Sequence, residues 1–482
     1  MNRRMIIRSL GFSLLILGAT MLFSLAFGLY YADAGRLPLL WSAAVTAGVG
    51  GLLTKVKPER YTLDIKEGFI LTAFVWIFSS VFGALPFVLS GAIPNVLNAL
   101  FETVSGFTTT GSTILSEIET LPPSILMWRS FTHFIGGMGV LVFVVAILPR
   151  GRDNDSHSIN VLKAEVPGEF GKLTSRLANT ARALYAIYVG MTVILTVILL
   201  IAGMNLFDAL TTSFATAGTG GFSPHNASIA YFNSPTIEWI LTFGMLAFGV
   251  NFNLYYAKLM TGGRIFTKSR EFMRYVEIFL GACLLMALKN LSLVGNFLTS
   301  LRESAFTAAS VMTTTGFITV DFEAWPTFSK GILLMLMFIG ACAGSTGGGI
   351  KVGRIVVLGK AALAEIKRII HPHRIVAVRD ETGVLSSEKL RSVLSYFVLY
   401  IFVFAISFFL VTWEGKDLIT SFTAVATTMN NVGPGLELVG PVQNFAHFGD
   451  FTKIVLIIDM LAGRLELIPI LVFFVPEAWF RN

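Results

Sequence analysis

The stretch "TTTGF" (residues 313–317) lies between two long apolar segments, 273–296 and 329–358. Threonine and glycine are weak helix formers, and a polar turn of this kind is a poor match for lipid. Segments of the same character occur four times, at intervals of roughly a hundred residues. They are "ALFETVSGFTTTGST" (99–113), "DALTTSFATAGTGGFS" (208–223), "ESAFTAASVMTTTGFIT" (303–319) and "DLITSFTAVATTMNNVGPG" (417–435). Each begins with a short helix-forming run and then reaches a glycine.

The composition is that of an integral membrane protein. Of the 482 residues, 54% are apolar and only 13% are charged, whereas soluble domains carry about 25% charged residues. Several apolar windows have the length of about 20 residues that crosses a bilayer as a helix. The start resembles a signal peptide, but its apolar run is too long and no cleavage site follows, so we expect a retained first helix. The ten predicted spans lie roughly at 8–31, 38–55, 66–91, 126–149, 180–203, 235–258, 273–296, 329–358, 391–412 and 452–479.

The four threonine-rich segments are too short to cross a membrane. Non-helical backbone at membrane depth is tolerated only where it is buried in protein or lines a watery cavity. We therefore expect each segment to enter as a half-helix and to return as an extended strand. The turning glycines are Gly111, Gly220 or Gly221, Gly316 and Gly433.

Four such turns around one axis would form a ring of carbonyl oxygens, which can replace the hydration shell of a monovalent cation. Each half-helix would direct its C-terminal end, with a partial charge of about −0.5, at this ring. A single "TTTG" is more often an ordinary loop turn. Four in equivalent positions favour an ion-selective pore.

The four segments and an extra N-terminal hairpin resemble, over essentially the whole chain, the TrkH subfamily of the Trk/Ktr/HKT potassium transporters. The resemblance implies an all-α polytopic protein with four potassium-channel-like M1–P–M2 repeats around a pseudo-fourfold pore, and it implies potassium uptake. The expected division is a hairpin at 1–58 and repeats at 59–155, 156–265, 266–375 and 376–482.

The resemblance also assigns residues to the selectivity filter. The filter positions fall on Thr110, Gly111, Thr219, Gly220, Gly221, Thr315, Gly316, Val432 and Gly433, with Thr109, Thr314 and Asn431 as supporting residues. The second turn has two glycines, so its central position stays open between Gly220 and Gly221. Family members that accept sodium carry Ser in place of the first glycine, so Gly111 favours potassium. No turn carries the full channel motif "TVGYG", which predicts looser selectivity.

The eighth predicted span contains "FIGACAGSTGGGIKVGR" (338–354). A continuous helix would lose about 1 kcal/mol per glycine relative to alanine, so the span should break. A phosphate-binding loop does not fit, because no strand precedes the run and Lys351 does not directly follow its last glycine. Close helix packing through small residues is the alternative. We expect a flexible intramembrane gating loop, as the resemblance also implies, formed by Gly344, Ser345, Thr346, Gly347, Gly348 and Gly349.

Arg464 and Glu466 lie inside the apolar run "MLAGRLELIPILVFF" (460–474). Charges at membrane depth are costly and usually functional, although Arg464 could instead pair structurally with Glu466 or Asp459. The resemblance places this arginine just below the filter, against the gating loop. Further upstream, we expect Arg129 to reach the membrane interface and His133 to be a hydrogen-bonded core histidine.

Alternate loops are rich in Lys and Arg, which predicts that they and both termini are cytoplasmic. These loops are 54–66, 150–182, 258–274 and 360–391. The opposite loops carry acids such as Glu102 and Asp208, so we expect a negative mouth that attracts cations.

The cysteines (Cys283, Cys342) and the pair His371 and His373 are too few for a disulfide framework or a metal site. The expected ligand is potassium, with no organic cofactor. The net charge of +7 reflects orientation in the membrane lipid rather than binding to nucleic acid. By resemblance, we expect a homodimer in the bacterial inner membrane with a cytoplasmic nucleotide-binding partner of the TrkA type. A proton- or sodium-coupled symporter is the alternative function, and an intramembrane enzyme is disfavoured because paired catalytic groups are missing.

Overall fold

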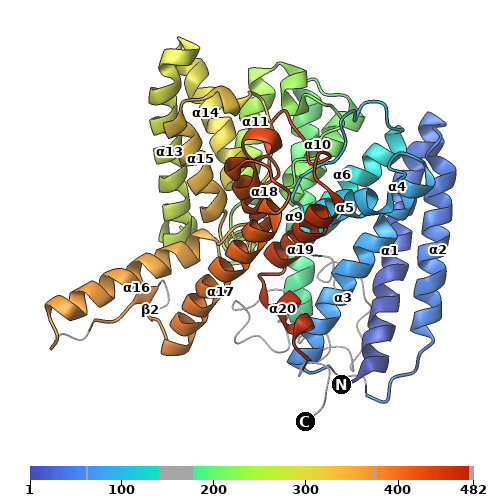
Figure 1. Ribbon diagram of the computed structural model, residues 1–482, viewed down its shortest axis with the longest axis horizontal. Helices are drawn as coiled ribbons and strands as arrows, with labels where there is room; N and C mark the ends of the chain where they lie inside the picture. Colours follow the sequence, from blue (N-terminus) through green and yellow to red (C-terminus); the bar gives the residue numbers. More distant parts are fainter. Residues whose placement is uncertain (61–62, 140–176, 374–375, 381–382, 477–482) are drawn as a thin grey trace.

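The computed structural model describes residues 1–60, 63–139, 177–373, 376–380 and 383–476. Helices dominate these residues, and a two-residue antiparallel hairpin, β1 (Arg379–Asp380) and β2 (Gly383–Val384), is the only sheet among them (Figure 1). Figure 1 places the N-terminus and the helix α20 (Ile468–Phe474) at the same end of the molecule. The predicted all-helical class is confirmed.

The first two helices, α1 (Arg3–Tyr31) and α2 (Arg36–Thr54), form a closely packed antiparallel pair. A side chain built on Gly11 would lie 2.8 Å from the carbonyl oxygen of Gly50, so only glycine allows this approach of the two backbones. Small residues at helix crossings are the usual device of membrane proteins, because lipid offers no hydrophobic drive for association.

One order of elements then recurs four times: a long helix, a short buried helix, an extended return and a second helix. The first set consists of α3 (Ile65–Gly83) with α4 (Leu85–Leu89), α5 (Val96–Phe107) and α6 (Pro123–Gly137), and the second of α9 (Leu177–Ile201), α10 (Leu206–Gly218) and α11 (Pro235–Phe248) with α12 (Phe252–Thr261). The third set consists of α13 (Arg270–Val294), α14 (Phe297–Met312), α15 (Thr327–Ile339) and α16 (Val352–Ile370). The fourth consists of α17 (Ser387–Thr412), α18 (Leu418–Asn430), α19 (Asp450–Arg464) and α20. Short 3₁₀ turns at Ser228–Phe232, Phe266–Lys268, Phe322–Ala324 and Glu437–Val439 complete the connections.

Within the described residues, six helical segments are long and apolar enough to cross a membrane, namely α1, α2, Lys66–Leu89, α9, α13 and α17. The protein is therefore a multi-pass membrane protein. The other four predicted spans are not single straight helices. The predicted span 126–149 continues beyond α6 into residues outside the described part of the chain.

The breaks in the second helices have local causes. Between α11 and α12 the axis bends by 84° near Gly249. The segment 340–351 separates α15 from α16. The join of α19 and α20 contains Glu466 and Leu467 at φ of 56° and 68°, left-handed values that no α-helix accommodates.

Glycines bring the second helices of the first, second and fourth sets against the C-terminal end of a short helix. A side chain on Gly136 would collide with the carbonyl oxygen of Phe107, which ends α5, and one on Gly463 with that of Met429 in α18. A side chain on Gly249 would lie 3.1 Å from Cγ2 of Thr313, just after α14. These second helices therefore gather around the ends of the short helices.

Candidate functional site

The four short helices begin in the same way. Asparagine or aspartate stands at each N-cap (Asn95, Asn205, Asn296 and Asp417), and its side chain accepts a hydrogen bond from a backbone N–H of the first turn. Such caps define where a helix starts and satisfy one of its free donors. The helices are buried along most of their length, so they are interior elements rather than lipid-facing spans.

The four helices also end in the same way, and this ending defines the four turns (109–111, 219–221, 314–316 and 431–433). The first residue of each turn is left-handed, with φ of 55°, 55°, 59° and 54° at Thr109, Thr219, Thr314 and Asn431. The third residue is a glycine at positive φ, namely 81° at Gly111, 76° at Gly221, 81° at Gly316 and 103° at Gly433. Because side chains strain this conformation, glycine is the suitable residue there.

The middle residue of each turn donates its N–H to the carbonyl five residues earlier. These bonds are Thr110 to Ser105 (2.9 Å), Gly220 to Ala215 (2.9 Å), Thr315 to Ser310 (2.8 Å) and Val432 to Thr427 (2.9 Å). These hydrogen bonds show which of the two glycines in the second turn is structurally equivalent to the glycines of the other turns. Gly221 is the equivalent of Gly111, Gly316 and Gly433, and Gly220 is the equivalent of Thr110.

The four turns contact one another in a closed ring. Side chains built on Gly111, Gly221 and Gly316 would collide with the carbonyl oxygens of Gly220, Thr315 and Val432, respectively. One built on Gly433 would lie 2.9 Å from the carbonyl oxygen of Thr110. Each turn therefore touches the next, and the fourth closes on the first. Segments more than 300 residues apart meet here, as in the hydrogen bond of 2.8 Å from Nδ2 of Asn431 to Oγ1 of Thr110.

Backbone carbonyls are available in this ring. Among the hydrogen bonds of the described residues, none uses the carbonyl oxygen of Thr110, Thr315 or Val432 as acceptor. The threonine hydroxyls instead form hydrogen bonds with near neighbours: Oγ1 of Thr108 and Thr110 lie 2.8 Å apart, and those of Thr313 and Thr315 lie 2.7 Å apart. Rings of free backbone carbonyl oxygens are able to replace the hydration shell of a monovalent cation.

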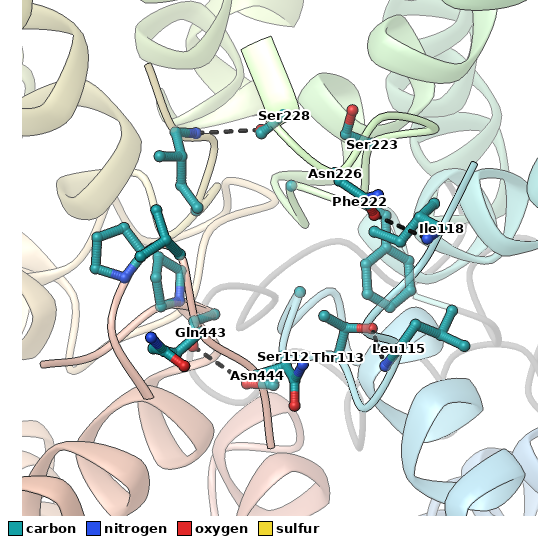
Figure 2. Close-up of a pocket in the computed structure, with 18 of the residues that line it drawn as sticks. Ser112, Thr113, Leu115, Ile118, Phe222, Ser223, Asn226, Ser228, Gln443 and Asn444 are labelled. Carbon is teal, nitrogen blue, oxygen red and sulfur yellow. Dashed lines mark hydrogen bonds between the residues drawn. The ribbon is translucent and has the colours of Figure 1, made fainter. Parts of the chain in front are cut away.

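A cavity of about 200 Å³ adjoins the ring and is lined by all four of its positive-φ glycines. Figure 2 shows polar side chains around this cavity, including Ser112, Asn226 and Asn444. Asn226 Oδ1 accepts from the Ile118 N–H (2.8 Å), and Asn444 Nδ2 donates to Ser116 Oγ (3.1 Å). These bonds join the return of the first set to those of the second and fourth, so the mouth is fixed by contacts between sets.

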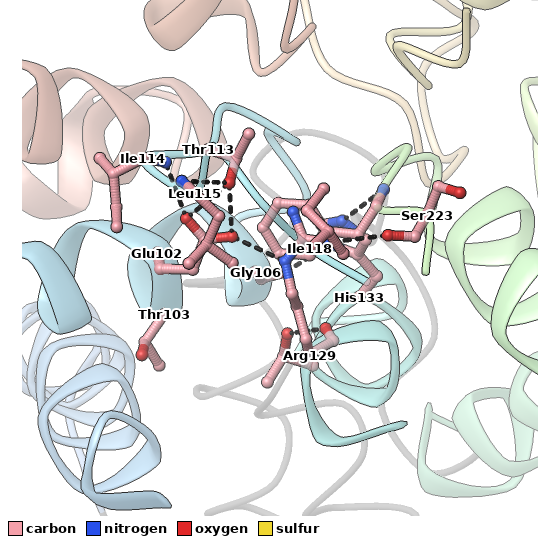
Figure 3. A network of polar contacts seen from close by, with 12 residues as sticks. Glu102, Thr103, Gly106, Thr113, Ile114, Leu115, Ile118, Arg129, His133 and Ser223 are labelled. Carbon is pink, nitrogen blue, oxygen red and sulfur yellow. Dashed lines mark hydrogen bonds and ion pairs between the residues drawn. The ribbon is translucent and has the colours of Figure 1, made fainter. Parts of the chain in front are cut away.

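A buried ion pair supports the ring from the side (Figure 3). Arg129 on α6 and Glu102 on α5 are 2% and 0% exposed, and Nε lies 2.7 Å from Oε1. Glu102 also accepts from Thr113 Oγ1 (2.9 and 3.0 Å) and from the Ile114 N–H (3.0 Å). The prediction that Arg129 reaches the membrane interface is therefore wrong, because a partner from α5 holds it in the interior. Glu102 is equally no part of a negative mouth, since Arg129 neutralises it.

Arg129 and His133 extend this support to the second turn. Arg129 Nη1 donates to the carbonyl of Ser223 (3.0 Å), and its guanidinium stands 3.5 Å from the centre of the Phe222 ring. The Phe222 N–H donates to Nε2 of His133 (3.2 Å), so Nδ1 carries the proton that binds the Gly106 carbonyl (2.8 Å). His133 is thus the hydrogen-bonded core histidine that the sequence predicted.

The glycine-rich segment (340–351) lies against the base of two turns. The Gly348 N–H donates to Thr314 Oγ1 (2.6 Å), and the Gly349 N–H donates to the carbonyl of Asn430 (3.1 Å). On its other side, the Phe252 N–H donates to the carbonyl of Gly344 (3.0 Å). The segment therefore spans from the second set to the fourth beneath the ring, and the predicted break in the span is observed.

Arg464, at the end of α19, donates hydrogen bonds to two separate segments beneath the ring. Nη1 donates to the carbonyl of Thr346 (2.7 Å), and Nη2 donates to those of Gly136 and Gly137 (2.6 Å each). The arginine thus joins the glycine-rich segment to the end of α6. The two acids considered as its partners have other contacts: Glu466 pairs with Arg354, and Asp459 accepts from Ser407 Oγ (2.6 Å).

These features define a class of protein: multi-pass helical membrane proteins in which four linked sets of helices surround one ring of backbone turns. Residues 41–481 match the family model TrkH, described as a cation transport protein. The Trk system potassium uptake protein TrkH of Salmonella typhimurium is 36% identical over 488 residues, covering 99% of this chain and 100% of the relative. The Trk system potassium uptake protein TrkG of Escherichia coli is 33% identical over 487 residues, covering 99% and 98%.

A solved structure agrees with these sequence matches. The crystal structure of the potassium transporter TrkH from Vibrio parahaemolyticus superposes with a TM-score of 0.90 at 34% identity, over 100% of both chains. The chain therefore belongs to the TrkH family of cation transport proteins, as the sequence predicted. This family consists of transporters and not of enzymes.

Proposed function

We propose that this protein is the pore subunit of a Trk-type system and takes up potassium across the bacterial inner membrane. The observation that carries the proposal is the closed ring of four equivalent turns, each with a positive-φ glycine facing the next turn. A ring of main-chain oxygens suits a dehydrated monovalent cation, because carbonyl dipoles can replace its hydration shell. The relatives named above are potassium uptake proteins, and their likeness covers the whole chain.

Potassium, as the transported substrate, would be held by carbonyls of the four turns. The ligands are assigned to the filter residues Thr110, Gly111, Thr219, Gly220, Gly221, Thr315, Gly316, Val432 and Gly433, with Thr109, Thr314 and Asn431 in support. The four short helices end at this ring, and each contributes a partial charge of about −0.5. Cations are thereby favoured over anions before any contact is made.

The glycine-rich segment acts as the gate in this proposal. Gly344, Ser345, Thr346, Gly347, Gly348 and Gly349 lie beneath the ring, and Arg464 fastens them to α6. A guanidinium in the ion path opposes a second cation, so conduction requires that these hydrogen bonds be released. Glycine makes such movement accessible, because its backbone has many conformations of similar energy.

Organisation and partners form the remainder of the proposal. The chain divides into the hairpin at 1–58 and four pore repeats at 59–155, 156–265, 266–375 and 376–482. The basic loops favour a cytoplasmic position for both termini. Much of one such loop (150–182) lies outside the described residues. On that side a nucleotide-binding regulatory subunit of the TrkA type would dock, and the pore subunit would form a homodimer.

Rubidium flux into lipid vesicles that contain only this chain tests the function. We expect uptake that potassium inhibits more strongly than sodium, and that persists without any proton or sodium gradient. Gly316→Ser should reduce the uptake, since its side chain would meet the Val432 carbonyl. Uptake that stops when the gradients are removed would favour the coupled symporter, and a lack of rubidium uptake or of competition by potassium would refute the proposal.

A further inference from the structure

Lys351 is a second cation at the proposed gate, and unlike the partly buried Arg464 it is buried. It stands at the N-cap of α16 with φ of 82°, and only 7% of it is exposed. Lysine is rarely buried without a partner, because removing an ammonium from water is costly. Its Nζ donates a hydrogen bond to the carbonyl of Gly347, four residues back in the glycine-rich segment.

The hydrogen bond between Lys351 and Gly347 lies next to the ring. A side chain on Gly347 would lie 2.8 Å from the carbonyl oxygen of Thr313, the residue that precedes the third turn. The neighbouring carbonyl, that of Thr346, is held by Arg464. Two side-chain cations therefore occupy two consecutive carbonyls of the glycine-rich segment.

The acids near Lys351 among the described residues also have other partners. It interacts electrostatically with Glu466, Glu271, Arg464 and Arg354. Glu466 pairs with Arg354, and Glu271 Oε1 accepts the N–H groups of Ala343 (2.8 Å) and Gly353 (2.9 Å). Among the described residues that interact with Lys351, and counting Lys351 itself, three cations stand beside two carboxylates.

Lys351 also links the gate to α16. The N–H groups of Arg354 and Ile355 donate to its carbonyl oxygen (3.1 and 3.2 Å), so it begins that helix. Figure 1 shows α16 projecting away from the rest of the molecule. A displacement of α16 would therefore move the Lys351 ammonium and its hydrogen bond to Gly347 together.

We propose that Lys351 is a tethered cation of the gate: its ammonium occupies the Gly347 carbonyl beneath the ring and repels the transported ion until α16 moves. The proposal rests on the potassium-pore function above. A unit charge within about 10 Å of an ion, at an effective dielectric constant of about 20, changes the occupancy of that ion by on the order of tenfold or more.

The test is rubidium flux into vesicles through the full chain carrying Lys351→Gln, Lys351→Met or Lys351→Arg. Lys367→Gln is the matched control, because it removes one positive charge from the exposed last turn of the same helix. We expect the neutral variants to raise the initial flux on the order of tenfold. Lys351→Arg and Lys367→Gln should stay near the unmodified protein.

Equal flux in Lys351→Gln and Lys367→Gln would overturn the proposal, as would an equal rise in Lys351→Arg. If both neutral variants fail to fold while Lys351→Arg folds, the charge serves folding rather than gating, which also overturns it. Failure of the proposed function is distinguishable, because then the unmodified protein and Lys367→Gln carry no potassium-sensitive flux either.

Discussion

Removing Arg129 should destabilise the protein through the charge that it leaves behind. In Arg129→Met, Glu102 stays fully buried and keeps only the hydrogen bonds from Thr113 and Ile114. Breaking a buried ion pair by removing one partner costs about 3–5 kcal/mol. This cost includes the loss of the cation–π contact with Phe222, because such contacts contribute about 0.5–2 kcal/mol.

The double variant separates the ion pair from simple packing. Glu102→Gln alone leaves the guanidinium buried, with the Ser223 carbonyl and the Phe222 ring as its partners. Glu102→Gln combined with Arg129→Met removes both charges, so its cost should fall short of the sum of the single variants by about 3 kcal/mol. Denaturant titration of the purified protein in detergent micelles measures each free energy of unfolding.

A surface ion pair provides the matched control. Arg274 and Glu277 on α13 approach to 2.5 Å, but their side chains are 61% and 51% exposed. Arg274→Met and Glu277→Gln should each change the free energy of unfolding by no more than about 0.5 kcal/mol. Additive single and double variants at Glu102 and Arg129, or costs equal to those of the control pair, would refute the argument.

Three further variants probe the ring and the gate. Gly221→Ala should abolish rubidium flux, because its side chain would meet the Thr315 carbonyl. Its control, Gly91→Ala, should retain flux, because Gly91 has a similar positive φ but no neighbouring atom within 4 Å. An equal loss of flux in both variants would show that only backbone strain matters. Arg464→Ala should raise flux by removing a gate cation and its three hydrogen bonds, and unchanged uptake in vesicles would contradict the role of the arginine. Asn431→Ala removes the bond to Thr110 Oγ1, so sodium should compete with rubidium more effectively, and an unchanged competition curve would count against this support.

Local signals explain why so much of the ring could be predicted from sequence. Threonine-rich half-helices that end in glycine, and spans broken by glycine runs, are recognisable within short windows because propensity and polarity conflict with lipid there. The choice between Gly220 and Gly221 could not be made in this way. It depends on φ at Thr219 and Gly221, and either glycine satisfies the sequence pattern.

Contacts between distant segments could not be predicted from short windows of the sequence. Glu102 and Arg129 are 27 residues apart. The sequence predicted that Glu102 belongs to the negative mouth and that Arg129 reaches the membrane interface. A charge in an apolar run was the available signal for Arg129, yet nothing in its neighbourhood names Glu102 as partner. Lys351 was considered only as a failed phosphate-loop lysine, since its contact with Gly347 exists only once the backbone takes a left-handed turn.

The electrostatics of the short helices connects the ring with the cations below it. Four helix C-termini converge on one centre, and each brings a partial charge of about −0.5, so the centre attracts positive charge whatever its source. In the proposed function, a transported cation would supply that charge from the cavity side. Arg464 and Lys351 supply it from the opposite side, through carbonyls of the glycine-rich segment. In the proposed function, the potential that binds the ion would therefore also hold the gate closed, and withdrawing the side-chain cations should free the path without changing the ring itself.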